Sequence, residues 1–580
     1  MGDDWWRRAA VYQVYVRSFA DGNGDGVGDL AGVRSRLPYL RDLGVDALWF
    51  NPWYLSPWAD GGYDVADYRA IDPQFGTLAE AEALITEARE LGLRTIVDIV
   101  PNHVSDQHPW FRSALNAGPG SPEREWFWFR AGKGPTGDEP PNGWDSIFGG
   151  PAWTRTKNPD GTPGDWYLHL FAPEQPDLNW DHPAVRQEHE DVLRFWFDRG
   201  VAGARIDSAA LLVKDPALPE IGPDEVHAPG RHPHTDRDEV HQVYESWRRV
   251  ADGYDPPRVL LGEVWLPDWS RMRLYLRPGE MHSAFNLDFL TSPWDPARLR
   301  ECIDTTLREH AQVGAPATWV LSNHDVTRPV TRYGRDDTSF AFETKRAGTP
   351  TDLALGARRA RAAALLALAL PGSVYVYQGE ELGLPEVEGI DPDRIEDPMH
   401  FRSGGVDPGR DGARVPLPWS GDAPPYGFSP PGAAESPLPQ PTDWAGYAVD
   451  AQAGDSTSTL ELYRAALHHR RDDPDLAGDD FRWLDLDAAG GPSSAGGADT
   501  PSDQDWDHVL AFARGERFAC VVNLATGPVD LPAHEHVSLS SHPLDGDGRL
   551  APDTAAWLRL PTTEESSACS APTPGEWSTR

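Results

Sequence analysis

Short apolar runs alternate with amphipathic stretches along the first two-thirds of the chain. Runs of strand length occur at Ala10–Phe19, Asp46–Phe50, Leu93–Val100, Gly203–Asp207, Val259–Glu263, Thr318–Leu321 and Val374–Tyr377. Helical periodicity fills the intervals, as in Thr77–Leu91 and Val185–Arg199, and each of these two stretches is followed by a Gly suited to ending a helix. The pattern predicts an α/β fold with parallel strands, and eight such units would close a (β/α)8 TIM barrel.

This alternation is interrupted twice and then replaced. After a first barrel part at 1–103, residues 104–181 are polar and rich in Gly, Pro and Trp, which predicts an inserted subdomain after the third strand. The second barrel part, 182–475, contains a Pro- and Gly-rich stretch at about 383–444 that predicts a long loop. Residues 476–580 contain short strand patterns and are expected to form a C-terminal β-sandwich domain. Within it, a mobile loop is expected at 488–505 and a disordered tail after about residue 563.

Composition narrows the range of partners. The chain has 580 residues and a formal net charge of -39, which disfavours nucleic acid and anionic membranes. Its three Cys are scattered, so neither a disulfide framework nor a zinc site is expected. We find no apolar signal core and no run of 18 apolar residues, and therefore expect a cytoplasmic protein. The sequence leaves the oligomeric state open between a monomer and a homodimer. The 24 Trp either fill a large core or stack on sugar rings.

Polar residues gather where four of the predicted strands end. The clusters are Asp98–His103, Gly203–Asp207, Leu261–Trp265 and Leu321–Asp325. A single charge in such a place is readily explained as the first solvated loop residue. Four together indicate an active site, because the carboxyl ends of all barrel strands lie on one face.

The carboxylates in these clusters suit the cleavage of a glycosidic bond. A retaining enzyme needs an ionised carboxylate that attacks the anomeric carbon and a protonated one that releases the leaving group. Asp207 suits the first role, because Arg205 two residues earlier favours its ionised form. Glu263 follows an apolar run, and a dry setting raises the pKa of an acid. Asp325 is a third carboxylate, able to hold sugar hydroxyls.

In this order, the four clusters resemble the signature regions of the α-amylase family, glycoside hydrolase family 13, over nearly the whole chain. The resemblance implies Asp207 as nucleophile, Glu263 as acid/base and Asp325 as transition-state stabiliser. It also implies that His103, Arg205 and His324 bind the first glucose. The segment Gly61–Tyr68 resembles the family's segment after the second strand, which makes Tyr63 a stacking platform and Asp64 a partner for distal glucose hydroxyls.

A finer resemblance is to the oligo-1,6-glucosidase and α-glucosidase branch. It rests on Gln175–Trp180, on Trp144–Gly150, on His169–Phe171 and on Arg410–Pro416, which resembles the segment that closes the pocket. It implies that Gln175 belongs to the substrate site, that Phe148 and Phe171 wall the pocket, that Arg328 and Arg332 bind substrate, and that Arg410 pairs with Asp64. Core packing would also account for the aromatic residues, and a loop ion pair for Arg410. A closed pocket implies release of glucose from the non-reducing end of short α-glucosides.

Linkage preference depends on Ser208, the residue after the nucleophile. In this branch Val there accompanies α-1,6 preference and Thr accompanies α-1,4 preference; Ser is nearer Thr, which favours maltose-type α-1,4 links. Alternatives are an oligo-1,6-glucosidase or a glucosyl transferase or isomerase similar to trehalose synthase. A non-catalytic partner-binding module is disfavoured, because such members lose the catalytic carboxylates and carry a membrane segment.

A metal site is also predicted. The loop Asp21–Asp29 places oxygen ligands at positions 1, 3, 5, 7 and 9 of a Ca²⁺ loop, with Gly at position 6, but lacks the Glu of position 12. The ligands would be Asp21, Asn23, Asp25, Val27 and Asp29, and the same loop is a structural metal site in the branch. We expect structural Ca²⁺, with Mg²⁺ as the second choice and a metal-free Asn/Asp/Gly turn as the alternative.

Overall fold

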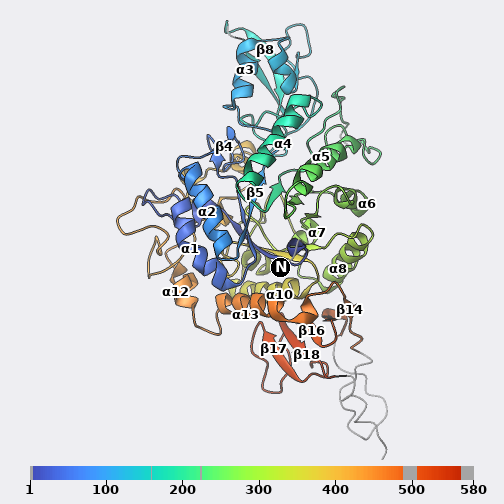
Figure 1. The fold of residues 1–580 in the computed structure, drawn as a ribbon. Coiled ribbons are helices and arrows are strands. Elements are labelled where there is room, and N and C mark those ends of the chain that lie inside the picture. The colour runs from blue at the N-terminus through green and yellow to red at the C-terminus, as the bar shows by residue number, and fades with distance from the viewer. Residues whose placement is uncertain (1–3, 159, 223–224, 487–505, 563–580) are drawn as a thin grey trace, which may run out of the picture.

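A ring of eight parallel strands forms the centre of the computed structural model, which describes residues 4–158, 160–222, 225–486 and 506–562. The strands are β1 (Ala10–Val14), β2 (Ala47–Phe50), β5 (Arg94–Ile99), β9 (Gly203–Ile206), β10 (Val259–Gly262), β11 (Ser283–Ala284), β12 (Thr318–Val320) and β13 (Ser373–Tyr377). Neighbours in this order are paired, and β13 pairs with β1, so that the sheet curls into a ring. Among the described residues, the one neighbouring pair without ladder pairing is β11 and β12; the predicted TIM barrel is confirmed (Figure 1).

Helices surround the ring and have clear boundaries in the sequence. They are α1 (Leu30–Leu43), α2 (Leu78–Glu90), α4 (Pro183–Asp198), α5 (His241–Asp252), α6 (Trp269–Met272), α7 (Leu287–Thr291), α8 (Pro296–Ala311), α9 (Pro329–Tyr333), α10 (Leu353–Ala369) and α13 (Thr459–Asp472). Asp29 caps α1 by accepting the Gly32 N–H, and Gly44 ends it with φ 101°. Thr77 and Glu80 form a capping box on α2. Strands such as β1, β10 and β13 are buried along their whole length, which explains their continuous apolar runs.

The inserted subdomain lies between β5 and α4 and projects from the barrel at the top of Figure 1. It contains α3 (Pro109–Ala117) and a three-stranded antiparallel sheet of β6 (Phe129–Arg130), β8 (Pro163–Leu168) and β7 (Trp153–Lys157). A fully buried cation joins it to the barrel: Lys214 Nζ lies 2.8 Å from Asp177 and donates to Asn102 at 2.6 Å. The subdomain is thereby fixed above the carboxyl ends of the strands.

The C-terminal domain differs from the expected β-sandwich. Its described residues form one antiparallel sheet in the order β14 (Arg482–Trp483), β15 (Val509–Arg514), β16 (Phe518–Asn523), β18 (Thr554–Arg559) and β17 (His536–Ser540). Helix α10 takes the place of a second sheet, because Trp557 and Arg514 donate to the carbonyls of Leu365 and Ala369. The loop expected at 488–505 and the tail expected after 563 lie outside the described residues.

The stretch 383–444 is a long loop with the short helix α11 (Pro398–Arg402), and α12 (Val449–Gln452) follows it. A two-stranded sheet of β3 (Tyr54–Leu55) and β4 (Asp67–Ile71) follows β2. In the described part of the chain, no helix combines the length and apolar character needed to cross a bilayer.

Candidate active site

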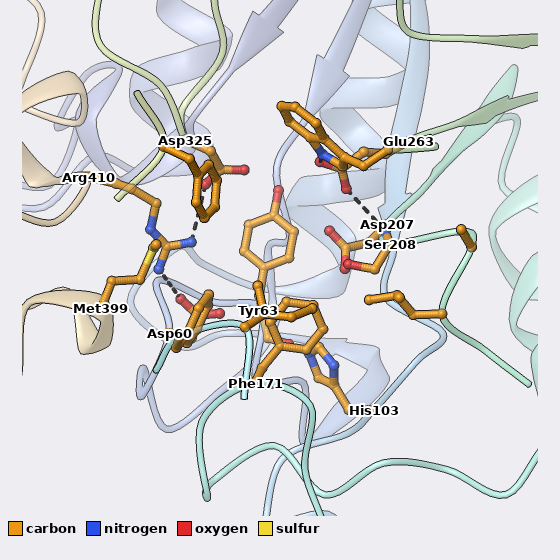
Figure 2. A pocket seen from close by; sticks show the side chains of 16 residues that line it. Asp60, Tyr63, His103, Phe171, Asp207, Ser208, Glu263, Asp325, Met399 and Arg410 are labelled. Atoms are coloured by element: carbon orange, nitrogen blue, oxygen red, sulfur yellow. Dashed lines mark hydrogen bonds and ion pairs between the residues drawn. The ribbon is translucent and has the colours of Figure 1, made fainter. Parts of the chain in front are cut away.

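The four polar clusters meet at a cavity of about 390 Å³. Asp207 follows β9, Glu263 follows β10, and Asp325 follows β12, so three of the barrel strands each contribute a carboxylate. The other lining residues are Asp60, Tyr63, His103, Ile147, Phe148, Phe171, Ser208, Ala210, Leu211, Trp265, Phe342, Met399 and Arg410. Figure 2 shows Asp207 and Glu263 on one side of the cavity and Asp325, Arg410 and Asp60 on the other, with Tyr63 between them.

One buried guanidinium connects the acids on the first side. Arg205 Nη1 lies 2.7 Å from Asp207 Oδ1 and 2.9 Å from Asp98 Oδ1, and its Nη2 lies 2.7 Å from Glu263 Oε2. Burial raises the pKa of Asp207 from its ordinary value, and the charge of Arg205 opposes this effect. Burial likewise raises the pKa of Asp98 to about 8, again against Arg205. Arg205 therefore favours the ionised form of Asp207, as expected from the sequence.

Glu263 has the properties of a general acid. Burial raises its pKa to about 7, and the charges of Asp207 and Asp325 add to that effect, while Arg205 opposes it. The Ser208 backbone N–H donates to Glu263 Oε2 at 3.0 Å, and Trp265 Nε1 donates to Oε1 at 3.1 Å. Both oxygens are thus fixed in position, and the raised pKa leaves a substantial share of the group protonated near neutral pH.

Asp325 has the opposite electrostatic environment. Its carboxylate lies 2.8 Å from Arg414, 3.2 Å from Arg410 and 3.3 Å from His324. Burial acts to raise its pKa, but His324 and the two Arg together hold the pKa well below the ordinary value. Asp325 is therefore ionised at the mildly acidic pH values at which Glu263 is protonated.

The end of the cavity opposite Glu263 is closed by an ion pair between Arg410 and Asp60, where a pair of Arg410 and Asp64 was expected. Arg410 Nη2 lies 2.6 Å from Asp60 Oδ1, and Arg410 Nε lies 2.6 Å from Asp397. Asp64, the expected partner of Arg410, is fully buried outside the cavity lining, where it accepts bonds from Ser56 Oγ and from the N–H groups of Ala59 and Asp60. Asp64 therefore shapes the turn that presents Asp60.

Aromatic and imidazole rings line or support the same end. Tyr63 lines the cavity and stacks on His324 with ring centroids 5.2 Å apart and an interplanar angle of 7°. Burial lowers the pKa of His103 to about 4, so its imidazole is neutral at pH 7. Gln175, fully buried, places its amide nitrogen 2.9 Å from Asp60 and 3.0 Å from His103. Gln175 thus positions two cavity residues rather than lining the cavity itself.

Phe148 and Phe171 lie in the cavity wall, as expected, with ring centroids 5.2 Å apart. Ser208 also lines the cavity, and its φ of 46° places a non-glycine residue in the left-handed region. Arg205 and His324 are almost fully buried and contact the cavity's carboxylates and Tyr63.

Arg328 and Arg332 lie away from the cavity lining. Arg328 donates to the carbonyls of Gln378 and Ala413, and Arg332 donates to those of Leu290 and Leu321. Both are buried, at 1% and 4% exposure. The expectation that they bind substrate is therefore corrected: these side chains satisfy backbone carbonyls of the surrounding loops.

The loop Asp21–Asp29 turns around its own carboxylates. Asp21 accepts the N–H groups of Asn23, Gly24 and Gly26, and Asp29 accepts those of Gly22, Asn23 and Gly32. No group of three His, Cys, Asp or Glu among the described residues is arranged to hold a metal. The donor set is all oxygen, which is the chemistry that Ca²⁺ prefers, although both oxygens of Asp29 and both of Asp21 are turned towards N–H groups of the loop.

Several cavity residues were missed by the sequence analysis. Asp60 precedes a segment that was recognised, and Trp265 follows Glu263 by two positions, so both had a local signal. Phe342 and Met399 also line the cavity, and Asp397 accepts a hydrogen bond from Arg410; all three come from segments whose path no periodicity predicts.

Comparison with known proteins agrees with this geometry. The family model described as "Alpha amylase, catalytic domain" matches residues 13–479. A probable α-glucosidase of Rhizobium meliloti is 36% identical over 504 residues, covering 83% of this chain and 85% of that protein. An oligo-1,6-glucosidase of Parageobacillus thermoglucosidasius is 33% identical over 506 residues, covering 80% and 84%.

Solved structures give a similar result. The α-glucosyl transfer enzyme XgtA has a TM-score of 0.78 and 33% identity, with 96% of this chain and 99% of that chain covered. An isomaltulose synthase from Erwinia rhapontici NX5 has a TM-score of 0.78 and 29% identity, with the same coverage.

Proposed function

Because this chain belongs to the α-amylase family and is a glycoside hydrolase, we propose that it is a retaining α-glucosidase that releases glucose from the non-reducing end of short α-glucosides. The observation that carries the proposal is the cavity in which Asp207, Glu263 and Asp325 meet and whose far end is closed by the Asp60–Arg410 ion pair. A cavity closed at one end accepts a chain terminus and not the middle of a polymer.

The carboxylates act in two steps. Asp207 attacks the anomeric carbon; the bond to the leaving oxygen breaks, and Glu263 gives that oxygen its proton. Water then attacks the glucosyl–Asp207 ester, Glu263 takes the water proton, and Asp207 leaves as a carboxylate. Arg205 contacts both acids, and Ser208, directly after Asp207, donates to Glu263. The two carboxyl groups are therefore neighbours, which supports retention, since retaining enzymes keep them about 5–5.5 Å apart.

The glucose unit would be held between the two sides. Asp325, kept ionised by Arg410 and Arg414, would hold hydroxyls near the reacting carbon and stabilise positive charge developing there. Asp60, in the role first expected of Asp64, would bind distal hydroxyls, with Arg410 beside it. Tyr63 offers its ring as a platform, and His103, Arg205 and His324 complete the set of groups around the first glucose.

For the part of the cavity that holds the leaving group, we propose that the enzyme prefers α-1,4 over α-1,6 links, because Ser208 places a small hydroxylic side chain beside the nucleophile. For the loop Asp21–Asp29 we propose a structural Ca²⁺ that would hold the segment between β1 and α1, with the oxygens of Asp21, Asn23, Asp25, Val27 and Asp29 as ligands.

A second candidate function is glucosyl transfer or isomerisation through the same intermediate. The observation that favours it is the likeness to structures titled as an α-glucosyl transfer enzyme and as isomaltulose synthase. The relatives named α-glucosidase and oligo-1,6-glucosidase favour hydrolysis.

The testing experiment is product analysis with maltose by NMR. We expect free glucose, released first as the α-anomer, and loss of turnover in Asp207→Asn. Accumulation of disaccharide isomers or longer oligosaccharides with little glucose would favour the second candidate. No turnover of any α-glucoside by the pure wild type would refute both.

A further inference from the structure

A second set of contacts lies behind the closed end of the cavity and centres on Arg17. Its Nη1 lies 2.5 Å from Glu396 Oε2 and its Nη2 donates to Glu396 Oε1 at 3.0 Å, so the ion pair is bidentate. The guanidinium carbon also lies 5.3 Å from the centre of the Trp58 ring, within the range of a cation–π contact. Arg17, which follows β1, thus bridges the turn after β3 and the long loop at 383–444.

The Glu396 end of this bridge is coupled to the ion pair that closes the cavity. Glu396 directly precedes Asp397, which pairs with Arg410. The backbone N–H groups of Glu396 and Asp397 both donate to one carboxylate oxygen, Asp411 Oδ2, at 2.7 and 3.1 Å. A displacement of Glu396 therefore moves Asp397, and with it the main partner that orients Arg410.

The Trp58 end is coupled to Asp60, two residues later. Trp58 has a φ of 68°, in the left-handed region that bulky side chains rarely adopt. Its backbone N–H donates to Ser56 Oγ at 3.0 Å, and its indole N–H donates to Asp72 Oδ2 at 3.1 Å. A strained conformation persists only where the surroundings determine it, and the Arg17 guanidinium over the indole ring is part of those surroundings.

Together these contacts form a ring around the end of the cavity that would hold glucose. The ring runs through Trp58, Arg17, Glu396, Asp397, Arg410 and Asp60. Its inner half includes the Asp60–Arg410 pair, which lines the cavity (Figure 2). Its outer half lies outside the cavity lining, where the side chains of Arg17 and Glu396 are 17% and 39% exposed.

We propose that Arg17 is a positioning residue of the active site, which keeps Asp60 and Arg410 in the arrangement that binds the non-reducing glucose. Arg17 does not touch the substrate and acts through Trp58 and Glu396. The proposal rests on the proposed α-glucosidase function, in which Asp60 binds distal hydroxyls of glucose with Arg410 beside it. Asp207 and Glu263 lie on the other side of the cavity, so the chemical steps are unchanged.

Removal of Arg17 should weaken binding more than chemistry. The turn and the long loop would lose a contact that holds them together, and the closed end would be correctly placed for only part of the time. If that fraction is about one tenth, the apparent affinity for glucose falls about tenfold, because only the competent arrangement binds.

Arg17→Ala tests this with p-nitrophenyl α-glucoside as substrate and glucose as competitive inhibitor. We expect KM and the inhibition constant of glucose each to rise about tenfold, with kcat within about twofold of wild type. Glucose has no leaving group, so its inhibition constant reports on this end of the cavity. Arg17→Lys keeps the charge without the bidentate geometry and should give intermediate values. Glu396→Ala, at the more exposed end of the pair, should reproduce both changes and applies the same test if Arg17→Ala folds poorly.

Arg34→Ala is the matched control. Arg34 pairs with Glu87 through two nitrogens, with Nε 2.9 Å from Oε2, and joins α1 to α2 outside the cavity lining. This variant removes a comparable Arg–Glu pair from the protein surface. It should leave KM and the inhibition constant of glucose at their wild-type values.

A double-mutant cycle with Asp60→Ala separates positioning from a general effect on the fold. In the Asp60→Ala background, Arg17→Ala should change kcat/KM by less than about twofold, because the contact that it supports is already missing. A tenfold loss in both backgrounds, or unchanged KM and glucose inhibition in Arg17→Ala and Glu396→Ala, would overturn the proposal while leaving the α-glucosidase assignment intact. Failure of the wild type to hydrolyse any α-glucoside would refute the α-glucosidase function instead.

Discussion

Arg410 Nη2 lies 2.6 Å from Asp60 Oδ1 across 350 positions of sequence, and this contact joins the long loop at 383–444 to the segment after β2. Arg410 also contacts Asp397 and Asp325, so one planar guanidinium group forms ion pairs with three carboxylates. The Arg410 side chain is only 7% exposed. At such a buried site the strength of these ion pairs depends on the planar, bidentate geometry of the guanidinium more than on its charge alone.

Replacing Arg410 by Lys should therefore impair substrate binding although the charge is kept. A single ammonium cannot bridge Asp60, Asp397 and Asp325, so Asp60 loses its fixed position. We expect kcat/KM for maltose to fall about a hundredfold, because a point charge does not replace a bidentate fork. Arg394→Lys is a matched control in the same loop, since Arg394 pairs with Glu435 outside the cavity lining. Near-equal losses in both variants would contradict a specific role of the Asp60 pair.

Much of the barrel could be predicted because seven of its strands are largely apolar, since both faces of a parallel strand are buried. Strand β11 was missed, since Ser283–Ala284 is too short to show a pattern. The expected strand Ala10–Phe19 ends at Val14, where the chain turns into a 3-10 helix at Val16–Ser18. The prediction of a β-sandwich was based on strand patterns alone. Such patterns show that one face of a sheet is buried, but not whether a second sheet or a helix packs against that face.

The positions of the three cavity carboxylates were predictable because each follows a strand, and strand direction fixes where its end points. The partner of Arg410 was not. Asp60 and Asp64 are four residues apart in one turn, and only the turn's hydrogen bonds, from Ala59 and Asp60 N–H to Asp64, determine which carboxylate faces inwards. Arg328 and Arg332 were misassigned for a similar reason, since sequence spacing does not show that loop carbonyls surround their side chains.

Arg332→Ala should therefore lower stability rather than glucose binding. Two buried carbonyls, those of Leu290 and Leu321, lose their donor, and an unsatisfied buried acceptor costs about 1–3 kcal/mol. We expect a lower thermal-unfolding midpoint and, below it, a kcat/KM for maltose within about twofold of wild type. Arg231→Ala, at an exposed position, is the control for stability. A large rise in KM with unchanged stability would instead indicate that Arg332 binds substrate.

Linkage preference can be tested with a pair of nearly isosteric variants at Ser208. Thr and Val are both β-branched, so each pays a similar penalty at a φ of 46°, and their comparison isolates the hydroxyl. We expect Ser208→Thr to keep the preference for maltose over isomaltose. Ser208→Val should raise the isomaltose-to-maltose ratio of kcat/KM about tenfold relative to Ser208→Thr, or about 1.4 kcal/mol in transition-state binding. Equal ratios in the two variants would show that this hydroxyl does not set linkage.

Calcium should stabilise the folded protein if the loop Asp21–Asp29 binds it. A ligand at a hundred times its dissociation constant adds about 2.7 kcal/mol to the folded state. We expect the thermal-unfolding midpoint to rise with added Ca²⁺ and to fall with a chelator, and Asp25→Asn to weaken this response. Asp422→Asn, an exposed position elsewhere, should leave it unchanged. A midpoint that is indifferent to Ca²⁺ and to chelator in the wild type would contradict the metal site.

The pH dependence of catalysis should follow the asymmetry between Glu263 and Asp325. Glu263 must carry its proton to release the leaving group, and its pKa is raised to about 7, so kcat/KM for maltose should decline as pH rises above about 7. Towards low pH, kcat/KM should decline as Asp207 becomes protonated, while Asp325 stays ionised because its pKa is held low.

Glu263→Gln should remove the basic limb of this profile and lower kcat/KM for maltose by about 10²–10⁴, the usual contribution of a general acid. A p-nitrophenyl α-glucoside needs little help from an acid, so its first step should be impaired much less, and a burst of p-nitrophenol should mark the slow second step. Asp325→Asn is the informative contrast: it should impair both substrates alike. If Glu263→Gln keeps a basic limb near pH 7, another group supplies the proton.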